Sequence, residues 1–209
     1  IPNYQDIPYI GIEDIRLFNF NNEIYFIGCS YNKNSNKVEI VSNKYEINKD
    51  FVPLFIKPNF DTNITTEKNW VFFNNNNDIN IIYKWFPLHI CKINYETCKL
   101  ELVNVNRQVP DFFSKLRGST NGIEYDNKIW FISHIQIMGC YLHIFVVFDK
   151  NMKLLGYSNF FNFEKQKVEY CIGMITNNNN FIITYSTLDK TTKLCVFSSN
   201  FVNNLIQYL

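Results

Sequence analysis

The stretch Cys171–Asp189, CIGMITNNNNFIITYSTLD, decides the fold of this chain. It has an alternating apolar run, a polar tip of asparagines and a second run rich in aromatic and β-branched residues, which is the pattern of a β-hairpin. Three earlier stretches share this pattern: Asp14–Asn32, Asn69–Phe86 and Asn121–Gln136. Because the four stretches begin 50–55 residues apart, each repeat has room for about four strands. A period of this kind predicts a β-propeller.

We therefore expect an all-β chain that forms about four propeller blades, at residues 12–48, 69–105, 122–163 and 168–205. Asparagine tolerates φ > 0, so the asparagine runs suit the hairpin tips. A last strand near 205–208 is expected to complete the fourth blade, and the proline-containing segment 50–66 is expected to be a loop between blades. We predict a single domain over residues 1–209.

The composition is that of a folded, strand-rich protein. Hydrophobic residues make up 46% and aromatic residues 17% of the 209 residues, which argues against disorder. The net charge of +1 does not suggest a nucleic-acid partner. The apolar runs are too short for a membrane span, and no signal peptide is visible. Since the chain does not begin with Met, we expect a fragment or processed piece that lacks an N-terminal blade.

The six cysteines indicate free thiols packed as small hydrophobes in a reducing compartment. They form no C-x-x-C pair, and most of them lie inside apolar strand runs. The three histidines are not at zinc-ligand spacing with them. We therefore expect a cytoplasmic protein with no metal and no cofactor. The heavy use of Asn, Lys and Ile suggests an AT-rich source such as a giant virus or a protist, in which case the compartment would be an infected host cell.

Charged residues gather where each repeat begins, and there the innermost strand of a blade points into the central pocket of a propeller. The four starts are GIEDIR from Gly11, TEKNW from Thr66, LRGST from Leu116 and EYCIG from Glu169. Each charge alone is typical of a solvated turn or of an ion pair between blades. Because the charged residues occur at the same place in all four repeats, we interpret them as the lining of one polar pocket. Two further candidates are His134 and Asp189, which end the second strands of the third and fourth repeats. The alternative interpretation is that His134 is a polar edge residue and Asp189 a turn residue.

The strings GIEDIRLF, EKNW followed by IIYKWFP, LRGST followed by FISH, and VEYCIGM followed by ITYSTLD resemble a family of five-bladed propellers. This is the β-1,2-mannoside phosphorylase and mannosyltransferase family, with its relatives described as predicted glycosyltransferases and glycosidases. The resemblance runs from Gly11 to about Asp189, and EKNW with the downstream Pro87 is its most specific part. The chain departs from the family pattern at Ile15, where Pro is usual, and at Ser119, where a second Gly is common.

The resemblance implies a role for each matching position. Asp14 would be the general acid, working on the bridging oxygen directly or through a sugar hydroxyl, because a positioned carboxyl can supply the proton as oxocarbenium-like charge develops. Phosphate or a sugar phosphate would be bound by Arg16, Lys68, Arg117 and His134. The sugar would lie among Glu13, Glu67, Asn69, Trp70, Tyr185 and Asp189.

The first functional hypothesis is a carbohydrate-active propeller that transfers or phosphorolyses a mannose-like sugar in this pocket without a metal. Its partners would be a sugar or a sugar phosphate. The alternatives are a non-catalytic glycan-binding propeller and a structural interaction propeller. Because the resembling family has five blades, each hypothesis allows another chain or domain to supply the missing blade.

Overall fold

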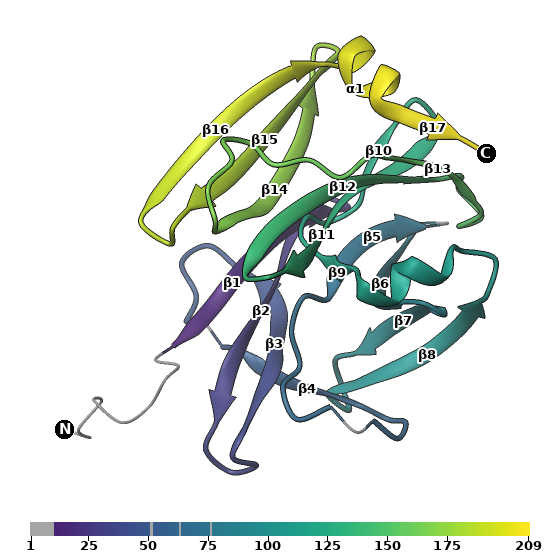
Figure 1. Ribbon diagram of the computed structural model, residues 1–209. Helices are drawn as coiled ribbons and strands as arrows, with labels where there is room; N and C mark the ends of the chain where they lie inside the picture. Colours follow the sequence, from purple (N-terminus) through teal and green to yellow (C-terminus); the bar gives the residue numbers. More distant parts are fainter. Residues whose placement is uncertain (1–10, 51, 63, 76) are drawn as a thin grey trace.

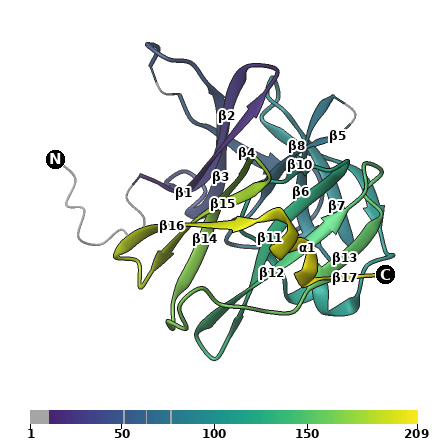
Figure 2. The same cartoon turned by 90° about the horizontal axis from the view of Figure 1, so that it is seen from above.

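The computed structural model describes residues 11–50, 52–62, 64–75 and 77–209. These residues form antiparallel blades arranged around a common axis (Figures 1 and 2). The first blade contains β1 (Ile12–Phe20), β2 (Glu23–Asn32), β3 (Lys37–Tyr45) and β4 (Leu54–Pro58). The second contains β5 (Val71–Asn75), β6 (Asp78–Trp85), β7 (Leu88–Asn94) and β8 (Lys99–Asn106).

The third and fourth blades complete the arrangement. The third contains β9 (Arg117–Gly118), β10 (Ile123–Tyr125), β11 (Lys128–Ile137), β12 (Cys140–Phe148) and β13 (Leu154–Ser158), to which β17 (Ile206–Tyr208) is added. The fourth contains β14 (Glu169–Asn177), β15 (Asn180–Thr187) and β16 (Thr191–Ser198). A short 3₁₀ helix (Asp111–Lys115) and α1 (Ser199–Leu205) lie between strands. The predicted all-β propeller with four blades is confirmed.

The innermost strands of the four blades surround the axis. β1 contacts β5, β5 contacts β10, β10 contacts β14, and β14 contacts β1. Apolar side chains fill the space between neighbouring blades, as blades that bury their faces only against each other require. Examples are the ring pairs Phe18–Phe72 at 5.5 Å and Phe73–Phe131 at 5.8 Å. The closed circle of β1, β5, β10 and β14 brings the starts of these four strands close together at one end of the axis.

The hairpin tips confirm the use of asparagine at positive φ. Asn21 and Asn22 turn β1 into β2 with φ of 51° and 61°, and Asn178 and Asn179 turn β14 into β15 with φ of 46° and 60°. In the tip between β5 and β6, Asn77 has φ 56°, whereas Asn76 lies outside the described residues.

The outer strands differ from the sequence-based expectation in two places. Segment 50–66, expected to be a loop, contains β4, which pairs with β3 and runs parallel to β8, so that the first two blades share one sheet. The fully buried side chain of Ile56 explains why this segment is a strand. The last strand, β17, pairs with β13 of the third blade instead of completing the fourth. The reversal begins at α1, where the Ser198 side chain caps the helix by accepting the N–H of Phe201.

Candidate functional site

A polar hollow of about 140 Å³ lies where the innermost strands begin. It is lined by side chains from all four blades, namely Asp14, Lys68, Asn69, Arg117, His134, Tyr141, Val168, Tyr170 and Asp189. Six of the eleven predicted site residues are therefore brought together, although they are up to 175 positions apart in the sequence. The hollow contains two carboxylates and two cations, a charge distribution suited to a polar or anionic ligand.

Three of these residues have a left-handed backbone. Asp14, Asn69 and Asp189 have φ of 54°, 64° and 53°, and each comes from a different blade. Asp and Asn tolerate this conformation better than most residues, so these side chains suit positions where the backbone turns at the edge of the hollow. Asp14 also lies in a β-bulge, since the pairing of β1 with β2 shifts register between Glu13 and Arg16. A bulge re-aims side chains, which accounts for the position of Asp14 at the hollow.

Arg16 does not line the hollow. Its guanidinium is buried and donates to four groups. Nε donates to the Ser119 carbonyl at 2.5 Å and Nη1 to the Asp14 carbonyl at 2.9 Å, while Nη2 donates to the Tyr170 hydroxyl at 2.5 Å and to the Gly118 carbonyl at 3.5 Å. These bonds join β1 to the segment after β9 and to β14. The predicted phosphate-binding residue is therefore placed as a clamp beneath the hollow.

Gly118 and Ser119 explain the LRGST string in structural terms. A Cβ at Gly118 would lie 2.5 Å from the Asn69 carbonyl oxygen, so only glycine allows β9 to approach the start of β5 this closely. Ser119 places its Oγ 2.8 Å from Nδ1 of His134. Its hydroxyl is thus a hydrogen-bonding partner that orients the imidazole.

His134 is neutral at physiological pH. Its ring is almost fully buried, and this burial, with smaller contributions from His143, Arg16 and Arg117, lowers its pKa well below 6.5. His143 lies opposite it on β12, and its Nε2 accepts the N–H of Cys171 at 3.2 Å. A neutral imidazole can donate or accept one hydrogen bond, but it cannot supply a positive charge to phosphate.

Tyr170 and Tyr141 line the hollow although no role was assigned to either from the sequence. The Tyr170 hydroxyl accepts from Arg16 and donates to Oδ1 of Asn69 at 2.9 Å. Burial raises the pKa of Tyr170, so the hydroxyl remains protonated. The string EYCIG contained this residue, but its charged neighbour Glu169 was the more conspicuous feature.

Glu169 has a supporting function in the structure. Its carboxylate is fully buried and accepts three backbone N–H groups, from Phe163 at 2.5 Å, Glu164 at 2.8 Å and Gln166 at 2.7 Å. It thereby holds the loop that leads into β14. A carboxylate that binds three amides is satisfied internally and is not directed at a ligand.

Four other predicted sugar-binding residues are placed outside the hollow. Trp70 is 1% exposed, and its Nε1 donates to Glu67, which also accepts from the Tyr83 hydroxyl. Tyr185 is stacked on Phe163 with ring centroids 4.1 Å apart, so its face is covered. Glu13 lies largely exposed beside the bulge, and the partial desolvation of its carboxyl, together with the neighbouring Asp14, raises its pKa.

In the described part of the chain, no three or more His, Cys, Asp and Glu side chains are grouped so that they could hold a metal ion. Within the same residues, no helix is long and apolar enough to cross a membrane.

Lowering the pH from 7 to 5 is expected to destabilise the protein. Burial lowers the pKa of His143 from 6.5 to about 4, so between these values the unfolded chain binds more protons than the folded chain. The free energy of unfolding therefore falls as the pH falls, by about 2 kcal/mol for His143 at pH 5. Urea unfolding at pH 7, 6 and 5 measures this slope, which should become shallower in His143→Gln. An unchanged slope in that variant would contradict the assignment.

Comparison with known proteins supports the fold. No protein-family model matches the sequence, and no curated protein matches it. Solved structures do match. The chain is similar to β-1,2-mannobiose phosphorylase from Listeria innocua, with a TM-score of 0.66 and 12% identity over 93% of this chain and 60% of the other.

Two further solved structures are similar. A putative glycoside hydrolase from Bacteroides ovatus matches over 90% of this chain and 69% of its own, with a TM-score of 0.63 and 11% identity. Another is from the GH130 family of mannoside phosphorylases, which contains glycoside hydrolases that target β-1,2 mannosidic linkages in Candida mannan. It matches over 91% of this chain and 66% of its own, with a TM-score of 0.58 and 12% identity. The chain thus has the propeller fold of carbohydrate-active proteins and spans 60–69% of their length.

Proposed function

We propose that this chain is a carbohydrate-active propeller that transfers or phosphorolyses a mannose-like sugar in the polar hollow. The observation that carries the proposal is the meeting of Asp14, Lys68, Arg117 and Asp189 in one hollow, each from a different blade. Charges placed together by four separate segments are difficult to explain as solvated turns. The similarity to a mannobiose phosphorylase and to glycoside hydrolases supports a sugar as the ligand.

In the proposed step, Asp14 is the general acid. A phosphate oxygen attacks the anomeric carbon, the glycosidic C–O bond breaks, and the carboxyl proton of Asp14 goes to the departing bridging oxygen. In transfer from a sugar phosphate to an acceptor hydroxyl, the same carboxylate takes the proton in the opposite direction. A single positioned carboxyl is sufficient for either direction, because phosphate itself is the nucleophile or the leaving group.

Lys68 and Arg117 are proposed to bind the phosphate. Arg117 is exposed on β9 and can make a bidentate contact with two phosphate oxygens, whereas the Lys68 ammonium acts as a point charge. Asn69, Asp189 and neutral His134 are proposed to bind sugar hydroxyls, since each offers a hydrogen-bonding group in the hollow. Arg16 contributes indirectly, as a positioning residue that holds Tyr170 and the Asp14 backbone.

Replacing Arg117 by Ala is expected to weaken binding of mannose 1-phosphate and of inorganic phosphate by about 10- to 100-fold, the loss expected for hydrogen bonds to a charged group. Isothermal titration calorimetry on the full chain measures this change. Arg107→Ala is the matched control, because Arg107 is also exposed but does not line the hollow. Equal losses in both variants, or a loss in neither, would exclude a phosphate site at Arg117. Binding of a sugar with no turnover of any donor would favour the non-catalytic glycan-binding alternative.

A further inference from the structure

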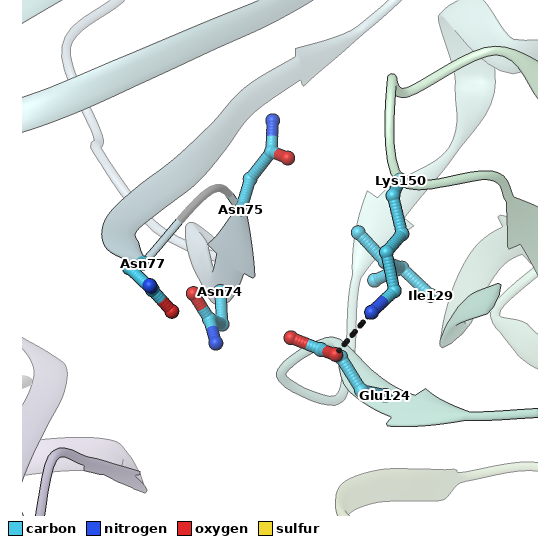
Figure 3. Close-up of a pocket in the computed structure, with 6 residues that line it drawn as sticks. All are labelled: Asn74, Asn75, Asn77, Glu124, Ile129 and Lys150. Carbon is cyan, nitrogen blue, oxygen red and sulfur yellow. Dashed lines mark ion pairs between the residues drawn. The ribbon is translucent and has the colours of Figure 1, made fainter. Parts of the chain in front are cut away.

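A second polar hollow of about 230 Å³ lies at the opposite end of the innermost strands. The first hollow uses residues at the starts of these strands, such as Asp14 and Asn69, whereas the second is formed where β5 and β10 end. Its lining residues are Asn74, Asn75, Asn77, Glu124, Ile129 and Lys150. Figure 3 shows Asn74 and Asn77 on one side and the Glu124–Lys150 ion pair, 3.2 Å long, across the gap from them.

Two side chains in this wall have an unsatisfied acceptor. Among the described residues, no donor reaches Oδ1 of Asn74 or Oδ1 of Asn75, and both atoms are buried. Buried polar atoms are rarely left unpaired, so this wall has hydrogen-bonding capacity that the described residues do not use. On the facing wall, the carboxylate of Glu124 accepts and the ammonium of Lys150 donates. Hydroxyl groups match this combination, because each of them both donates and accepts.

An apolar hollow of about 300 Å³ adjoins the polar one and shares Asn74 and Glu124 with it. It is lined by Leu17, Phe18, Ile123, Met174 and Ile175, among others. Two of these side chains are unusually exposed for their type, Leu17 at 64% and Ile175 at 58%. A ligand that covers these two side chains would bury apolar surface, which is favourable by about 25 cal/mol per Å².

We propose that this end of the propeller binds a neutral glycoside that carries an apolar group. Its sugar hydroxyls contact Asn74, Glu124 and Lys150, and its apolar group lies on Leu17 and Ile175. Among the described lining residues, the Glu124 carboxylate and the Lys150 ammonium are paired with each other, which favours a neutral ligand. The proposal does not depend on the function proposed for the first hollow.

Octyl β-glucoside, kept below its micelle concentration, is the probe, with methyl β-glucoside and a sugar-free octyl tetraethylene glycol ether beside it. Isothermal titration calorimetry of the full chain is expected to show at least fivefold tighter binding of octyl β-glucoside than of either partial probe. Glu124→Gln and Leu17→Ser should each weaken it at least fivefold. Both positions are partly exposed, so these variants are expected to fold.

The controls separate the two hollows. Arg117→Ala should leave octyl β-glucoside binding unchanged, and Glu124→Gln should leave mannose 1-phosphate binding unchanged. Equal affinity for the sugar-free ether would show an apolar patch without sugar recognition and overturn the proposal. It would also be overturned by no binding of octyl β-glucoside, or by binding that is lost in Arg117→Ala and retained in Glu124→Gln.

Discussion

Replacing Arg16 by Ala is expected to lower the free energy of unfolding by about 3–5 kcal/mol. The guanidinium is 4% exposed and donates to the Ser119 carbonyl, the Asp14 carbonyl and the Tyr170 hydroxyl. Each hydrogen bond from a charged group contributes about 1.5–3 kcal/mol, and truncation leaves buried acceptors without a donor. Urea unfolding followed by tryptophan fluorescence measures the change.

Arg117→Ala is the matched control for this stability measurement. Arg117 is exposed, so its removal is expected to change the free energy of unfolding by no more than about 0.5 kcal/mol. Arg16→Lys should recover only part of the loss, because an ammonium cannot reproduce the fork of guanidinium donors. If Arg16→Ala unfolds like the wild type, the clamp assignment is wrong.

The fold could be predicted from the sequence because local patterns of residues indicate it. Alternating apolar runs around asparagine tips predict hairpins, and their repeated spacing predicts blades. The pairing of β4 with β8 and of β17 with β13 was not predicted, since the two strands of each pair are far apart in the sequence. The fifth blade stays a prediction.

The residues of the candidate site could be predicted only in part, because position in the sequence does not determine the direction of a side chain. EKNW contains both outcomes: Lys68 and Asn69 line the hollow, whereas Glu67 and Trp70 form a buried hydrogen-bonded pair between blades. Arg16 carries the charge expected of a phosphate-binding residue, yet its guanidinium donates to the Ser119 carbonyl and the Tyr170 hydroxyl, which are 103 and 154 positions away in the sequence. Such contacts between distant segments leave no local signal.

The pairing of Arg16 with Tyr170 links the stability of the ring to the geometry of the hollow. Tyr170 donates to Asn69, so one chain of hydrogen bonds runs from β1 through β14 to the start of β5. Damage to the clamp should therefore shift residues of the hollow as well as weaken the fold. To test the contribution of a single chemical group, a substitution must leave this chain of hydrogen bonds intact. Asp14→Asn meets this condition.

Asp14→Asn is expected to lower kcat by about 10²- to 10⁴-fold, the usual contribution of a general acid. Asparagine tolerates the φ of 54° at this position, and the backbone carbonyl that accepts from Arg16 is retained. The fold should therefore be preserved, with the free energy of unfolding changed by about 0.5 kcal/mol or less. The assay is release of mannose 1-phosphate from β-1,2-mannobiose and inorganic phosphate.

Asp189→Asn tests whether the loss is specific to Asp14. Asp189 is the other carboxylate of the hollow, with nearly the same backbone conformation at φ 53°. Because Asp189 is proposed to bind sugar hydroxyls, the Asp189→Asn substitution should raise KM by about tenfold, which corresponds to the loss of one hydrogen bond of roughly 1.4 kcal/mol. The same substitution should leave kcat nearly unchanged. Full activity in Asp14→Asn would sink the general-acid role, and a larger loss of kcat in Asp189→Asn would exchange the two assignments. No turnover by the wild type would reject this reaction and leave the hollow as a binding site.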